Sequence, residues 1–152
     1  MQKSNLVAIS HSALTAFAEI CKPVCHELEI PQTAFDILLF LADHPELDTA
    51  KEITHHIGIK KNLVSMHVEK LVLQGYLVRE GIPGDRRQVR LVVTDKAAPV
   101  IEKGRRAKKY YQEFLVKGIS EEELVIYRKC MEKMGDNIEE LLQLLKNDKE
   151  VL

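Results

Sequence analysis

The apolar residues in the first third of the chain recur at the three- and four-residue steps of amphipathic helices. Residues 5–28 keep this spacing throughout and are predicted to form one long helix. Pro23 lies inside it and is expected to kink it, because proline lacks the backbone N–H and clashes with the preceding turn. A second helix with a broad apolar face follows residues 30–33 and ends at His44-Pro45.

Two shorter helices separated by a tight link are predicted next. Asp48 or Thr49 can cap the first of them, which ends at Gly58. After the link Ile59-Lys60-Lys61 the other runs to about Gln74, with the following glycine as a candidate C-terminal cap. Two helices joined by a short turn form a helix-turn-helix.

The period changes after this helix. Residues 76–80 and 89–94 are strand-like, the second being rich in β-branched residues, and Gly81-Ile82-Pro83-Gly84-Asp85 between them is typical of a turn. These segments predict a hairpin with a long basic tip. A hairpin directly after a helix-turn-helix makes a winged helix.

Two further helices complete the prediction. Thr94 can cap a long helix that runs to about Lys117, and Gly118 breaks it. Ser120 caps the last helix, with Glu123 placed for a capping box. We therefore predict a mainly α fold, in which a winged helix-turn-helix lobe with a small β-hairpin wing lies between N- and C-terminal helices.

Composition supports a globular chain. Its 152 residues are 45% hydrophobic and 30% charged, which suits one domain without disulfide staples. The three cysteines and the early polar break in the N-terminal segment argue against a secreted protein and predict a cytoplasmic one. No apolar run reaches the roughly 18 residues that a membrane span needs.

The charge is unevenly distributed along the chain. Residues 48–117 contain 15 Lys/Arg and 8 Asp/Glu, whereas residues 1–47 and 118–152 are each acidic with a net charge of −4. A basic middle between acidic ends suggests that the middle meets a polyanion. A solvated helix face with chance clustering is the alternative explanation.

Motifs for catalysis are missing from the sequence. It contains no GxGxxG or GxxxxGK[ST] loop, no GxSxG and no HExxH. We therefore expect no enzyme, no catalytic residue and no cofactor, although catalysis by scattered residues leaves no such signature.

The pattern from Ile53 to Ala97 resembles the MarR family of bacterial transcription regulators. The resemblance is carried by Gly58-Ile59-Lys60-Lys61-Asn62-Leu63-Val64-Ser65, by Leu71-Val72-Leu73-Gln74-Gly75-Tyr76-Leu77-Val78-Arg79, and by the wing Asp85-Arg86-Arg87 with Thr94 nine residues later. Two departures stand out. Met66 occupies a position where relatives often have Arg, and Ala97 replaces the glycine of the family's LTxxG.

The resemblance implies a single domain over residues 1–152 that acts as a homodimer. Residues 1–30 and 118–152 would be dimerisation helices, 31–97 the winged helix-turn-helix and 98–117 a connecting helix. The expected partner is double-stranded DNA with a pseudo-palindromic operator, and the expected function is a repressor released by a small-molecule or redox signal. A winged-helix protein-interaction module without specific DNA readout is the alternative function.

The candidate DNA-binding residues follow from this arrangement. They are Lys60, Lys61, Asn62, Ser65 and Met66 at the start of the recognition helix, and Arg86, Arg87 and Arg90 in the wing. Asp85 is expected to orient the wing by pairing with an arginine. Arg90 and Arg79 are candidates both for positioning the DNA backbone and for pairs on the strand face. Glu69 is expected only to orient a base, and His67 is ambiguous between a phosphate contact and the core.

Cys21 and Cys25 lie four residues apart in the first predicted helix and have three possible roles. They can pack as small apolar side chains, sense oxidants as some relatives do with a cysteine in the first helix, or bind a metal. Because no fourth ligand is visible, no metal site is predicted.

Overall fold

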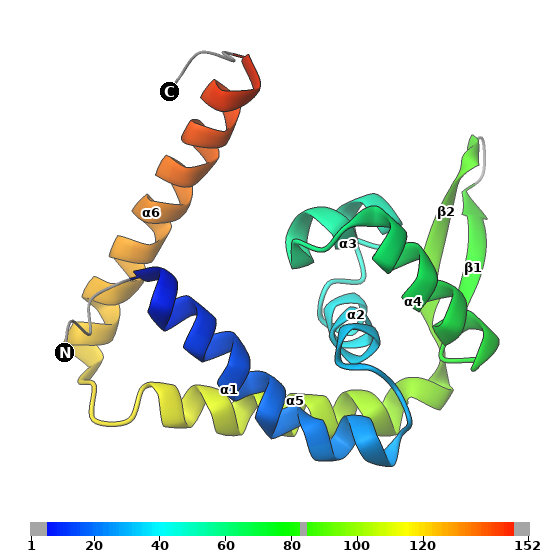
Figure 1. Cartoon of the computed structure of the whole chain (residues 1–152), viewed down its shortest axis with the longest axis horizontal. Helices are drawn as coiled ribbons and strands as arrows, with labels where there is room; N and C mark the ends of the chain where they lie inside the picture. Colours follow the sequence, from blue (N-terminus) through cyan, green and yellow to red (C-terminus); the bar gives the residue numbers. More distant parts are fainter. Residues whose placement is uncertain (1–5, 83–84, 148–152) are drawn as a thin grey trace. The chain divides into compact units, whose positions relative to one another are not determined.

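The structure, a computed structural model, describes residues 6–82 and 85–147, and the side chains of residues 8–81 and 89–146. The chain divides into two compact units, residues 1–111 and 112–152, which are described separately. Six α-helices and one β-hairpin follow one another along the described chain (Figure 1). The predicted fold class, mainly α with a small hairpin wing, is confirmed.

The core of the first unit is built around its second helix. α1 (Leu6–Glu27) contains Pro23, and α2 (Gln32–Asp43) packs against α1, α3 and α4. Its repeating apolar positions are almost all buried. The buried residues of α2 are Ala34, Phe35, Ile37, Leu38, Leu39 and Leu41.

The two helices of the helix-turn-helix begin and end where the local sequence predicts. α3 (Ala50–Ile57) starts with a capping box: Thr49 Oγ1 accepts a bond from Glu52 N (3.4 Å), and Glu52 accepts one from Thr49 N (3.0 Å). Of the two predicted caps, Thr49 is therefore the one used. Gly58 ends α3 with φ of 74°, which glycine adopts without steric cost, and α4 (Lys61–Leu73) follows.

The wing is longer than predicted. β1 (Leu77–Ile82) and β2 (Asp85–Val93) pair antiparallel, with Leu77 opposite Val93. The pairing extends into the segment expected to form the turn, where Ile82 lies opposite Asp85, with an irregular register between Gly81 and Ile82. A glycine inside a strand is typical of such an irregularity.

The predicted cap at Thr94 is wrong in one respect. Thr94 occupies the N-cap position of a short 3-10 turn, Asp95–Ala97, that leads into α5 (Ala98–Leu115), but its side chain makes no capping bond. Its hydroxyl donates instead to the carbonyl oxygen of Gly75 (2.7 Å). The hydroxyl therefore joins the end of the hairpin to the end of α4.

The second unit consists mainly of α6 (Glu121–Asn147). Its predicted capping box is confirmed, because Ser120 N donates to Glu123 (2.8 Å) and Glu123 N donates to Ser120 Oγ (3.2 Å). Many of its apolar side chains are exposed: Val125, Ile126, Tyr127, Met131, Ile138, Leu141, Leu142, Leu144 and Leu145. Within the described residues, no helix has the length and apolar character needed to cross a membrane.

Candidate nucleic-acid interface

α4 has one buried face and one exposed face. It packs against α2, α3 and β1. The buried positions follow the helical period and fix the orientation of the helix on the lobe. They are Val64, His67, Val68 and Leu71.

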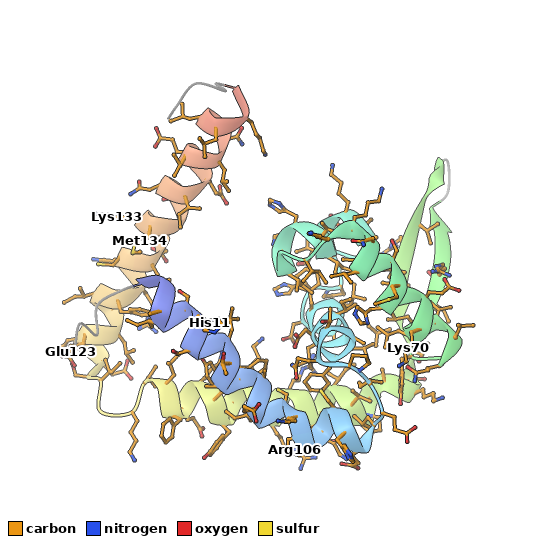
Figure 2. The ribbon with its side chains drawn as sticks, in the orientation of Figure 1. His11, Lys70, Arg106, Glu123, Lys133 and Met134 are labelled. Atoms are coloured by element: carbon orange, nitrogen blue, oxygen red, sulfur yellow. The ribbon has the colours of Figure 1, made fainter. Side chains whose placement is uncertain are left out.

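The predicted contact residues lie on the exposed face. Lys60 is the residue before α4, and the others occupy its first two turns. All are exposed, and Met66 is 55% exposed although it is apolar. The residues so placed are Lys60, Lys61, Asn62, Ser65 and Met66. In Figure 2 side chains stand out from α3 and α4 on the side opposite α2.

His67 belongs to the core side of α4. Its side chain is buried, and burial lowers its pKa, helped by the positive charge of Lys70. Lys70 itself is exposed near the end of α4 (Figure 2). Of the two roles left open by the sequence, the structure places His67 in the core.

The wing residues of the family motif are only partly described. β2 begins at Asp85, so the backbone of Asp85, Arg86 and Arg87 is in the strand. Their side chains lie outside the described residues. Their roles stay predictions.

The two arginines at the base of the wing are both paired. Arg79 Nη2 lies 2.7 Å from Glu69 of α4, and Arg90 Nε donates to Asp48 before α3. Each arginine is thus paired with a carboxylate outside the hairpin, and its contact with the DNA backbone stays a prediction. Sequence reasoning missed Asp48 as a partner because the two residues are 42 positions apart.

Part of the basic charge in the middle of the chain is neutralised internally. Lys103 pairs with Glu27, and Arg105 and Lys108 of α5 pair with Asp43 at the end of α2 (3.2 and 2.7 Å). Burial raises the pKa of Asp43, but Lys108 and Arg105 outweigh it and hold that pKa below its usual value. These basic side chains already have acidic partners within the first unit.

Cys21 and Cys25 are buried in the core between α1 and α2. Burial raises the pKa of Cys21 to about 11 and also raises that of Cys25. Reactive sensor thiols have lowered pKa values, so this environment favours packing. Among the described residues no group of three or more His, Cys, Asp or Glu side chains is arranged to hold a metal ion.

Comparisons with known proteins agree with this geometry. Residues 28–88 match the model of the MarR family. A MarR-family transcriptional regulator from Listeria monocytogenes, solved with a 26-mer DNA, has 16% identity, covers 95% of each chain and gives a TM-score of 0.81. A MarR protein from Peptoclostridium difficile has 22% identity and a TM-score of 0.78 over 97% of this chain and 95% of its own.

A third structure concerns regulation. BpsR from Bordetella bronchiseptica, whose DNA binding is regulated by 6-hydroxynicotinic acid, has 18% identity and a TM-score of 0.67 over 90% of this chain and 96% of its own.

Helix, turn, helix and paired wing strands define a winged helix-turn-helix protein. The family match spans the helix-turn-helix and reaches into the wing. The segment that contains this winged helix thus matches the MarR-family model, and the chain has the fold of MarR-family transcriptional regulators.

Proposed function

We propose that the protein is a homodimeric regulator of transcription that binds double-stranded DNA at a pseudo-palindromic operator. The observation that carries the proposal is the exposed, basic and polar start of α4, followed by a wing whose second strand begins with Asp85-Arg86-Arg87. An α-helix fits the major groove of DNA, and a basic hairpin can reach the neighbouring minor groove.

The residues of α4 divide by chemistry. Lys60 and Lys61 carry charge at the first turn and bind phosphate, which is independent of sequence. Asn62 presents an amide that can pair with adenine. The hydroxyl of Ser65 donates to Lys61 O (3.0 Å), so its oxygen remains as an acceptor for a base or a water molecule. Met66 offers apolar contact to a thymine methyl group.

In the wing, Arg87 enters the minor groove or binds phosphate, with Arg86 beside it. Asp85 orients one of them through a charge-assisted pair. In this arrangement the wing adds affinity for DNA, and most of the discrimination between sequences comes from α4.

The dimer is proposed from the apolar surface of the terminal helices. Leu14 of α1 is 72% exposed, and many apolar side chains of α6 are exposed in the single chain. A second copy covering residues 1–30 and 118–152 would bury them, with 31–97 as the DNA-binding lobe and 98–117 as the connection. Sedimentation of a stable monomer at micromolar concentration would overturn this part of the proposal.

Repression with release by a small molecule or a redox signal is the proposed mode of control. The regulation of BpsR by 6-hydroxynicotinic acid supports a small-molecule signal in a protein of this fold. An effector that moves the two lobes of the dimer apart or together would break their match to half-sites about 34–36 Å apart. It must bind the two arrangements with different affinity, since equal affinity shifts nothing.

The experiment that tests DNA binding compares a selected duplex with a scrambled one at two salt concentrations. Lys61→Ala should weaken both about equally and reduce the salt slope by about one. Asn62→Ala should cost roughly 1–3 kcal/mol of discrimination with little change in slope. If the parent chain binds neither duplex but binds a protein through α4, the proposal is wrong and the chain is a protein-interaction module.

A further inference from the structure

Asp48 holds the wing strand β2 by two bonds. It lies directly before Thr49, the cap of α3, and its side chain is only 11% exposed. Arg90 Nε donates to Asp48 Oδ2, and the next residue of the strand, Leu91, donates its backbone N–H to Asp48 O (2.8 Å). One residue thus fixes both the backbone and a side chain of β2.

A second acidic residue lies opposite Arg90 in the hairpin. Glu80 is its cross-strand partner in the hairpin. Asp48 raises the pKa of Arg90 above its ordinary value mainly through their hydrogen bond, and the charge of Glu80 adds to this. A DNA phosphate would have to displace Asp48 from this cation, against the added attraction of Glu80.

We propose that Arg90 is a positioning residue of the wing and not a DNA contact, and that it acts by holding β2 against Asp48 at the entry to α3. The inference rests on the proposed function, because the wing needs a fixed position only if it docks beside α4. α3 packs against α4, so a wing tied to Asp48 is placed relative to the recognition helix.

Removing one partner should cost more in this pair than in the other pair at the base of the wing, because Asp48 is buried. A buried carboxylate that loses its partner is left as an uncompensated charge, whereas a half-exposed pair is well solvated without it. Asp48 is of the first kind, and the Glu69–Arg79 pair, exposed on both sides, is of the second. Arg79 therefore serves as a matched control, since it is also a paired wing arginine.

The test uses the full-length chain and the variants Asp48→Asn, Arg90→Gln, the double variant and Arg79→Gln. Each of the first two should weaken binding to the selected duplex about tenfold, and the double variant should bind no more weakly than either single one. A phosphate contact predicts the opposite for Asp48→Asn, because removing a negative charge would leave binding unchanged or tighter. It also predicts that Arg90→Gln lowers the salt slope by about one in both backgrounds. Either result overturns the proposal.

A second measurement does not depend on DNA. Hydrogen exchange of the Leu91 amide in the unbound protein reports whether β2 stays attached. Arg90→Gln and Asp48→Asn should each speed this exchange at least tenfold, while Arg79→Gln leaves it unchanged and urea titration shows all variants folded. Unchanged Leu91 exchange in Arg90→Gln overturns the positioning role whatever the DNA result. If the parent shows no preference between duplexes, the proposed function fails, and the Leu91 measurement still decides whether Arg90 anchors the wing.

Discussion

Gly104 of α5 lies directly against Leu39 of α2. A Cβ at position 104 would be 2.8 Å from Leu39 Cδ1 and closer still to Leu39 Cδ2, nearer than real side chains approach. Both residues are buried, so α5 can lie this close to the central helix of the lobe only because residue 104 has no side chain. The glycine lowers helix propensity but permits a tight crossing of the two helices.

We expect Gly104→Ala to destabilise the protein in spite of alanine's better helix propensity. Overpacking a core of this kind costs about 1–3 kcal/mol, which a urea titration would detect. Gly81→Ala is the control, because nothing lies within 4 Å of the added carbon there. The double variant Leu39→Ala/Gly104→Ala should lose less than the sum of the single losses. Additive losses would show that the two residues are not coupled.

Asp36 gives a prediction about pH. It accepts a bond from Gln32 Nε2 (2.8 Å), yet burial outweighs that bond and raises its pKa. The folded state therefore holds this proton more tightly than the unfolded state, and stability is lost as pH rises through the folded pKa. Asp36→Asn should be more stable than the parent at pH 7, with the difference shrinking toward pH 3.

Asp43→Asn is the control with opposite sign. The pKa of Asp43 is lowered in the folded protein, so its ion pairs contribute stability above the ordinary carboxyl pKa and lose it as pH falls. Asp43→Asn should be less stable than the parent at pH 7 and approach it in acid. Urea titrations at several pH values measure both variants, and differences that do not depend on pH would contradict both assignments.

The environment of Cys21 and Cys25 predicts that neither is an oxidant sensor. At pH 7 a thiol with a pKa of about 11 is ionised in about one molecule in ten thousand. Alkylation followed by mass spectrometry should leave both thiols unmodified in the folded protein and label them in denaturant. Mild peroxide should leave DNA binding unchanged. Loss of binding that thiol reverses and that Cys21→Ser/Cys25→Ser abolishes would restore the sensor hypothesis.

Arg87→Ala should weaken DNA binding with little loss of stability. Arg87 is proposed to contact DNA and lies outside the pairs at the base of the wing, so binding should fall by roughly 1–3 kcal/mol while the free energy of unfolding changes by less than about 0.5 kcal/mol. Binding titrations and urea titrations of the same preparation measure the two effects. A variant that binds the selected duplex as the parent does would remove Arg87 from the interface.

Local signals predicted most of the fold, and distant pairs account for what they missed. Thr49 with Glu52 and Ser120 with Glu123 are capping boxes three residues apart, so the sequence reveals them directly. The partners of Asp48 and Thr94 come from residues 42 and 19 positions away, which no periodicity shows.

The charge pattern was only partly informative, because it too depends on pairs of residues far apart in the sequence. Clustered basic residues predicted a polyanion-binding middle, but Arg105 and Lys108 pair with Asp43 across more than 60 positions. The number of these charges can be read from the sequence, but which of them form ion pairs cannot. The exposed start of α4 was predictable because the apolar residues Val64, Val68 and Leu71 recur at helical spacing and therefore share one face. The polar residues between them lie on the other face.

Met66 provides the sharpest test of how α4 meets DNA. It is 55% exposed next to Ser65, and its thioether has no strong donor for a base edge or a phosphate. Arginine at this position can bind guanine through two parallel bonds or reach a phosphate. We expect Met66→Arg to raise affinity about tenfold, to steepen the salt dependence by about one unit and to increase preference for guanine at one position of each half-site.

Two control variants separate the possible causes. Met66→Lys adds the same charge without the planar fork, so it should raise affinity for the selected and scrambled duplexes alike. Met66→Leu keeps an apolar contact and should bind nearly as the parent does. Because the position is exposed, all three should unfold within about 0.5 kcal/mol of the parent. If Met66→Arg changes neither the affinity nor the salt dependence, this face of α4 lies away from the DNA, and the roles proposed for Lys61 and Asn62 fall with it.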